Sequence, residues 1–200
     1  LLIGIISFGV GISYSYGPIP ISRTPLGEIF SAFFMGFVIV FLGIYINMPD
    51  YKIPELIYIG KNYNFYLNLT QTVKIFLLSF SNFAAIFNIM LSNNICDCED
   101  DEKNKRYTLV YYIGKEYALK LYKMIYFMIY AVIIFLMISK VLPYTYIIIF
   151  FTLYGVLKNI KKFEKIQTKK DTFVLAVKNH FLINTVYLLI LIFGILVPGI

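Results

Sequence analysis

The sequence predicts an all-α fold, a multi-pass transmembrane bundle of about six helices that forms one domain over residues 1–200. The first observation is composition: 60% of residues are hydrophobic and 14% charged, against about 45–50% and about 25% in soluble domains. The second is the recurrence of mainly apolar windows of roughly 20 residues, the length that crosses a bilayer core. These windows lack the alternation of barrel strands, so they predict helices.

The expected spans follow one another along the whole chain. They cover residues 1–13, 28–47, 70–91, 117–139, 141–157 and 180–198. The first run is too short to cross a bilayer unless more helix precedes it, and it begins with Leu1 instead of Met. We therefore expect a fragment whose N-terminal helices are missing.

The basic residues predict the orientation of these spans. Twelve Lys and Arg residues lie in the first, third and fifth connections, which are residues 14–27, 92–116 and 158–179. Three lie in the second and fourth connections, at residues 48–69 and at Lys140. Since Lys and Arg near helix ends are enriched on the cytoplasmic side, the odd-numbered connections are expected to lie on the cytoplasmic face of a cell membrane.

The fifth connection is the most basic segment, with seven lysines among residues 158–179. Lysines next to a bilayer are attracted to anionic headgroups, each contributing about 1 kcal/mol. We therefore expect this segment to contact the lipid bilayer and not to bind nucleic acid, because the flanking helices hold it against the membrane.

Acidic residues gather at the end of the third span, where five of the chain's eleven fall within residues 97–102. If the helix continues through this segment, Asp97 and Asp101 share one face. Carboxylates so close repel one another unless a cation lies between them. Magnesium prefers oxygen ligands and often combines one or two carboxylates with substrate phosphates. Lys103 and Arg106, which follow, would complement a diphosphate. The acids not on this face, Glu99, Asp100 and Glu102, are expected to be solvated.

A simpler interpretation accounts for the same segment. Acidic clusters beside basic residues at helix ends often form solvated loops with local salt bridges, and spacing alone favours neither interpretation.

The residues themselves resemble a known family. The stretch "NNICDCEDDEKNKRYTLVYYIGK", residues 93–115, resembles the second aspartate-rich motif of the UbiA superfamily of intramembrane prenyltransferases. The stretch "YSYGPIPISRTPLGEIFSAFFMGFVI", residues 14–39, resembles the corresponding segment of the branch that acts in menaquinone biosynthesis. The two stretches cover about a quarter of the chain. The resemblance implies that the expected spans form the C-terminal two thirds of a nine-helix fold.

The resemblance also implies an activity. Members of that branch use Mg²⁺ to transfer a polyprenyl group from polyprenyl diphosphate to 1,4-dihydroxy-2-naphthoate, with decarboxylation, and so form demethylmenaquinone. Asp97 and Asp101 match the catalytic pair that binds the metal. The other matches are Arg23, Asn94, Lys103 and Arg106 for diphosphate and, more weakly, Tyr14 for the substrate pocket.

One departure from the family's pattern affects the metal site. The family has a first aspartate-rich motif on an earlier helix, whereas the aspartates here outside residues 97–102 are Asp50 and Asp171, neither within such a motif. The chain alone is therefore expected to hold at most half of the metal site and to be inactive. Two alternatives stay open: the same chemistry on another aromatic acceptor, and a non-catalytic or degenerate membrane protein.

Overall fold

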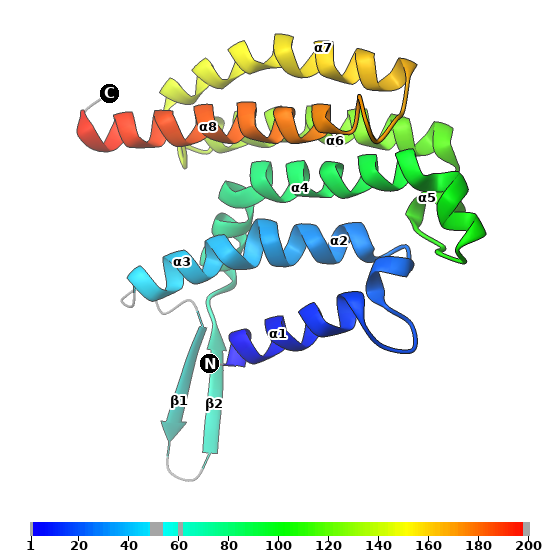
Figure 1. Cartoon of the computed structure of the whole chain (residues 1–200). Coiled ribbons are helices and arrows are strands. Elements are labelled where there is room, and N and C mark those ends of the chain that lie inside the picture. Colours follow the sequence, from blue (N-terminus) through cyan, green and yellow to red (C-terminus); the bar gives the residue numbers. More distant parts are fainter. Residues whose placement is uncertain (1, 49–53, 60–61, 198–200) are drawn as a thin grey trace.

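The computed structural model describes residues 2–48, 54–59 and 62–197 and shows an all-α membrane helical bundle (Figure 1). In this described part, four stretches are long and apolar enough to cross a membrane. They are Gly27–Asn47, Leu69–Lys103, Lys115–Ile138 and Val174–Leu196. The predicted fold class is confirmed. Leu1, Asp50, Lys52, Lys61 and Pro198, which entered the predictions of spans, motifs and topology, lie outside the described residues.

The first half of the chain contains α1 (Leu2–Ser15), a 3₁₀ turn η1 (Ile21–Arg23) and one long helix in three parts. Those parts are α2 (Gly27–Ser31), the π-helical η2 (Ala32–Val38) and α3 (Ile39–Asn47). Then come the strands β1 (Pro54–Ile59) and β2 (Asn62–Leu67) and the helix α4 (Leu69–Lys103). The second half contains α5 (Leu109–Ile113), α6 (Lys115–Ile138), the 3₁₀ segment η4 (Tyr144–Phe150), α7 (Phe151–Lys165) and α8 (Val174–Leu196).

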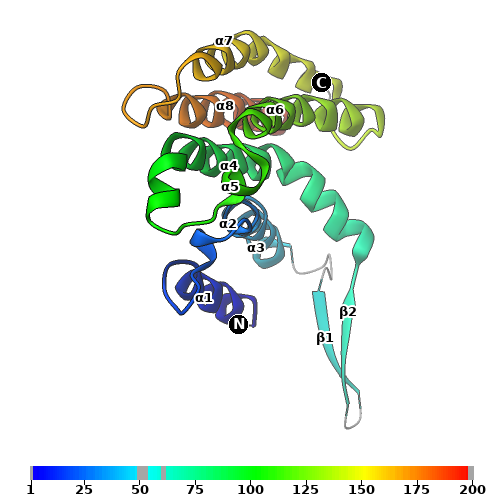
Figure 2. The same cartoon turned by 90° about the vertical axis from the view of Figure 1, so that its right-hand side faces the viewer.

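Helix α4 is the centre of the bundle. It packs against η2 on one side and against α6 and α8 on the other, with α1 and α7 in the outer layers (Figures 1 and 2). Small residues make this packing close: Ala84 and Ala85 of α4 are fully buried. At Gly36 of η2, an added Cβ would lie 2.5 Å from the Cα of Phe83. A glycine is needed there because the two backbones meet at that point.

Two of the predicted spans, the third and the fifth, differ from the helices in the structure. Helix α4 runs on to Lys103, beyond the predicted end at Leu91. The predicted span at residues 141–157 is instead a 3₁₀ segment followed by α7, which continues to Lys165. Val156, Ile160 and Phe163 of α7 are buried at helical spacing, so the lysines between them lie on an amphipathic helix and not in a loop.

The second connection also contains structure that the sequence did not predict. The strands β1 and β2 pair antiparallel and project from the bundle (Figure 1). At the opposite end of the bundle, η1, the segment after α4 and the loop between α7 and α8 lie together (Figure 1). These belong to the first, third and fifth connections, which were predicted to share one side of the membrane.

Candidate active site

The acidic segment is the last part of α4. Residues 69–103 contain no glycine or proline, so nothing interrupts the helix before Asn104 and Lys105, whose φ of 54° ends it. Asp97 and Asp101 therefore lie one turn apart on one face. Their side chains are only 16% and 6% exposed. The three acids that were predicted to be solvated are exposed: Glu99, Asp100 and Glu102.

Asp97 is held from two directions. The amide nitrogen of Asn93 donates a hydrogen bond to its Oδ2 at 3.3 Å. The ammonium of Lys169, in the loop between α7 and α8, pairs with the same oxygen. Sequence reasoning missed Lys169, because nothing separates it from the other lysines of the fifth connection until the fold brings that loop to α4.

Asp101 is held by Arg106. The guanidinium Nη1 lies 3.0 Å from Oδ1 of Asp101, and the backbone N–H of Arg106 donates to the carbonyl of Asp101 at 2.8 Å. Nη2 of Arg106 also donates to the carbonyl of Ser22 at 3.4 Å. Arg106 thus joins the acidic end of α4 to the first loop.

Asn94 faces α2 and makes a buried hydrogen bond there. Its Nδ2 donates to Oε1 of Glu28 at 2.8 Å, and Glu28 and Asn94 are 0% and 3% exposed. Sequence reasoning also missed Glu28, because an acidic residue in the first turn of a helix has an ordinary explanation as a partner of the helix dipole. Its position within an apolar stretch was the available signal.

The other two basic residues that were predicted to belong to the site, Arg23 and Lys103, lie at its exposed edge. The backbone carbonyl of Arg23 accepts from the N–H of Tyr107 at 3.1 Å, which brings the first and third connections together, and the Arg23 side chain is exposed. Lys103 pairs with the exposed Asp100 at 3.2 Å. The structure therefore brings Asn94, Asp97, Asp101 and Arg106 together, whereas Lys103 takes part in a local surface ion pair.

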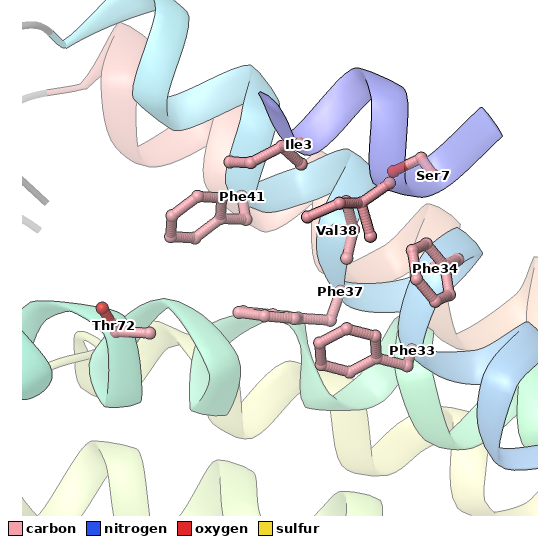
Figure 3. Close-up of a pocket in the computed structure, with 9 residues that line it drawn as sticks. Ile3, Ser7, Phe33, Phe34, Phe37, Val38, Phe41 and Thr72 are labelled. Carbon is pink, nitrogen blue, oxygen red and sulfur yellow. The ribbon is translucent and has the colours of Figure 1, made fainter. Parts of the chain in front are cut away.

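An apolar pocket opens between α1 and the helix α2–α3. It has a volume of about 220 Å³, and its wall includes Phe33, Phe37 and Phe41, with Thr72 of α4 on the far side (Figure 3). A second pocket of about 200 Å³ shares Ser7 and Phe34 with the first.

Tyr14 lines this second pocket. Its hydroxyl accepts from Oγ of Ser31 at 2.9 Å. Ser31 is one turn after Glu28 on α2, and both are buried. Helix α2 therefore connects the second pocket with the acidic end of α4.

The donor set at the end of α4 fits a divalent cation in part. Among the described residues, Oδ2 of Asp101 and Oε2 of Glu28 are buried without a hydrogen-bond partner, and carboxylate oxygens are ligands that Mg²⁺ prefers. In the same described part, no group of three or more His, Cys, Asp or Glu side chains is arranged to hold a metal ion. The described residues at this end of the bundle therefore include carboxylate oxygens but no complete set of metal ligands.

Comparison with known proteins agrees with the motifs. Residues 1–185 match the UbiA prenyltransferase family. The chain belongs to this family. It is also 26% identical over 196 residues to 1,4-dihydroxy-2-naphthoate octaprenyltransferase of Bacillus subtilis (strain 168). That match covers 98% of the chain but 56% of the relative, so the chain spans little more than half the length of this UbiA relative. No solved structure gives a significant match.

Proposed function

We propose that the whole protein transfers a polyprenyl group from polyprenyl diphosphate to 1,4-dihydroxy-2-naphthoate, with decarboxylation, to give demethylmenaquinone. The observation that carries this proposal is the sheltered pair Asp97 and Asp101 at the end of α4, with Arg106 and Lys169 beside it. Membership of the UbiA family supports prenyl transfer. The printed name of the Bacillus subtilis relative supports the acceptor.

In the proposed reaction, the bond between the first prenyl carbon and the diphosphate oxygen breaks, and the diphosphate leaves with the electron pair. The allylic carbon then bonds to the ring carbon that carries the carboxyl group, and carbon dioxide and a proton are released. Magnesium held by Asp97 and Asp101 would, when bound, neutralise charge on the departing diphosphate.

The cations of the site would bind the diphosphate. Arg106 has a fixed position between Asp101 and Ser22, so its guanidinium is oriented before substrate arrives. Lys169 brings a second positive charge to the same end. Arg23 and Lys103 are exposed and would contact the outer phosphate oxygens, Lys103 after leaving Asp100.

The aromatic pocket suits the prenyl chain. The rings of Phe33, Phe37 and Phe41 follow one another with centroids 5.3 and 5.6 Å apart. Such faces shelter an apolar chain and stabilise a developing carbocation. Tyr14, at the adjoining pocket, would form part of the wall near the reacting carbon.

The test is to supply the whole protein in membranes with Mg²⁺, polyprenyl diphosphate and one acceptor at a time, and to identify products by mass spectrometry. We expect a decarboxylated prenyl naphthalenediol from 1,4-dihydroxy-2-naphthoate. Product from 4-hydroxybenzoate alone would assign another acceptor, and no product from any aromatic acceptor would support a non-catalytic protein. The 200-residue chain by itself is expected to give no turnover, since two aspartates do not complete the metal site.

We also propose that the bundle crosses the cell membrane with the acidic end of α4 on the cytoplasmic side. The basic residues gathered in the first, third and fifth connections support that orientation. In a protein with Cys96 and Cys98 replaced by serine, Lys170→Cys should react with a membrane-impermeant maleimide in inverted vesicles and not in intact cells. The opposite labelling would reverse the topology.

A further inference from the structure

A series of contacting side chains links α2 to the acidic end of α4. Glu28 accepts from the amide nitrogen of Asn94 at 2.8 Å, across a sequence separation of 66 residues. The amide nitrogen of Asn93 lies 3.5 Å from Oδ1 of Asn94 and 3.3 Å from Oδ2 of Asp97. Lys169, which pairs with Asp97, is the last member of this series and is exposed at the surface. Every link is a side-chain contact, so the position of each group depends on its neighbour.

The first link fixes which atom of Asn94 faces the aspartates. An amide has one oxygen that accepts and one nitrogen that donates. Because the nitrogen is directed to Glu28, the carbonyl oxygen lies on the side of Asn93 and Asp97. The amide oxygen of Asn94 and the carboxylate oxygen of Asp97 thus converge on one donor, the amide nitrogen of Asn93.

We propose that Glu28 is a positioning residue, which holds the oxygen of Asn94 beside Asp97 so that both oxygens face the cation. This inference rests on the proposed function. It gives Asn94 a different role from the predicted diphosphate contact, since a carbonyl oxygen cannot donate to phosphate but is an oxygen ligand of the kind that suits Mg²⁺ and Mn²⁺. Groups that orient metal ligands in this way commonly change metal affinity by about 10–100-fold when they are removed.

Burial makes a purely structural role a poor explanation for Glu28. Its Oε2 is buried without a partner among the described residues, on a helix that must pack in an apolar environment. A leucine of roughly similar size would pack there without desolvating a carboxyl group. What a leucine cannot do is accept the hydrogen bond of Asn94.

The test uses the whole protein in lipid nanodiscs with an unreactive prenyl thiodiphosphate, and measures binding of Mn²⁺ by its electron paramagnetic resonance signal. Glu28→Gln keeps an acceptor for Asn94, so its Kd for Mn²⁺ should rise much less than that of Glu28→Leu, which also lacks the charge. Glu28→Leu removes the acceptor and should raise the Kd about 10-fold or more. A folded Glu28→Leu protein that loses thermal stability but keeps its Kd would overturn the inference.

A second variant covers the case in which Glu28→Leu does not fold. The reversed pair is the double variant Glu28→Gln with Asn94→Asp. The side-chain amide at position 28 then donates to one carboxylate oxygen at position 94, and the other carboxylate oxygen stays directed toward Asp97. This pair should bind Mn²⁺ at least as tightly as the original protein. Weak binding by the folded reversed pair would overturn the positioning role.

Asp97→Asn separates this inference from the proposed function. If Asp97→Asn leaves Mn²⁺ binding unchanged, the proposed metal site is wrong. If Asp97→Asn abolishes Mn²⁺ binding, but Glu28→Leu keeps its Kd and the folded reversed pair binds weakly, only the proposed role of Glu28 is wrong.

Discussion

The ammonium of Lys169 pairs with the carboxylate of Asp97 across 72 residues of chain. This ion pair ties the loop between α7 and α8 to the acidic end of α4, and it places a flexible positive charge beside a carboxylate that we propose as a metal ligand. The Asp97 side chain is 16% exposed while that of Lys169 is 59% exposed, so the lysine can leave without disturbing the packed core.

Replacing Lys169 should weaken binding of the prenyl donor. Lys169→Gln removes a charge-assisted contact, and such contacts are worth about 1.5–3 kcal/mol. Because the Lys169 side chain is 59% exposed, we expect the lower end of that range, a rise of about tenfold in the KM for polyprenyl diphosphate. Steady-state kinetics of the whole protein measure this. Lys170→Gln is the matched control, because Lys170 is the adjacent exposed lysine. Equal KM values for the two variants would contradict a role for Lys169 at the site.

Removing Arg106 should lower the stability of the protein. Arg106→Gln leaves the buried carboxylate of Asp101 without its cation and breaks the link to Ser22. Losing one partner of a buried pair costs about 3–5 kcal/mol, and we expect the lower part of that range because the Arg106 side chain is 31% exposed. Thermal unfolding followed by circular dichroism tests this. Lys105→Gln, one residue earlier and exposed, should leave the transition unchanged.

The close approach of η2 to α4 gives a prediction about stability alone. In Gly36→Ala the new methyl group would lie 2.5 Å from the Cα of Phe83, so one helix must shift. Overpacking of this kind costs about 1–3 kcal/mol, and the melting temperature should fall accordingly. Gly43→Ala is the control, since an added Cβ at Gly43 meets nothing within 4 Å. A melting temperature for Gly36→Ala as high as that of the control would show that the helices are farther apart.

Metal removal should stop the proposed reaction reversibly. Asp97 and Asp101 place two negative charges where the diphosphate would bind, and like charges so close repel one another unless a metal ion lies between them. We expect prenyl transfer by the whole protein to disappear with a chelator such as EDTA and to return with added Mg²⁺. Full turnover in a chelator would contradict the magnesium requirement.

The spacing of residues predicted part of the fold and of the candidate site. Apolar windows marked the helices, and the spacing of Asp97 and Asp101 placed both on one face because α4 has no residue that breaks it. Glu28 and Lys169 could not be found in this way. Their importance depends on contacts with Asn94 and Asp97 that exist only after distant segments pack together. The lysines of α7 were predicted to lie in the fifth connection because they interrupt the apolar run, whereas the spacing of Val156, Ile160 and Phe163 indicates a helix.

The most direct test of the central claim is the rate of Mg²⁺-dependent prenyl transfer by the whole protein with Asp97→Asn, Asp101→Asn or Asp100→Asn. Asp100 is the control, since it lies on the same turn but is exposed and paired with Lys103. The account predicts that the first two variants, while folded, lose at least about 100-fold in kcat, and that Asp100→Asn stays within about twofold. Folded Asp97→Asn and Asp101→Asn proteins with the original rate would contradict it.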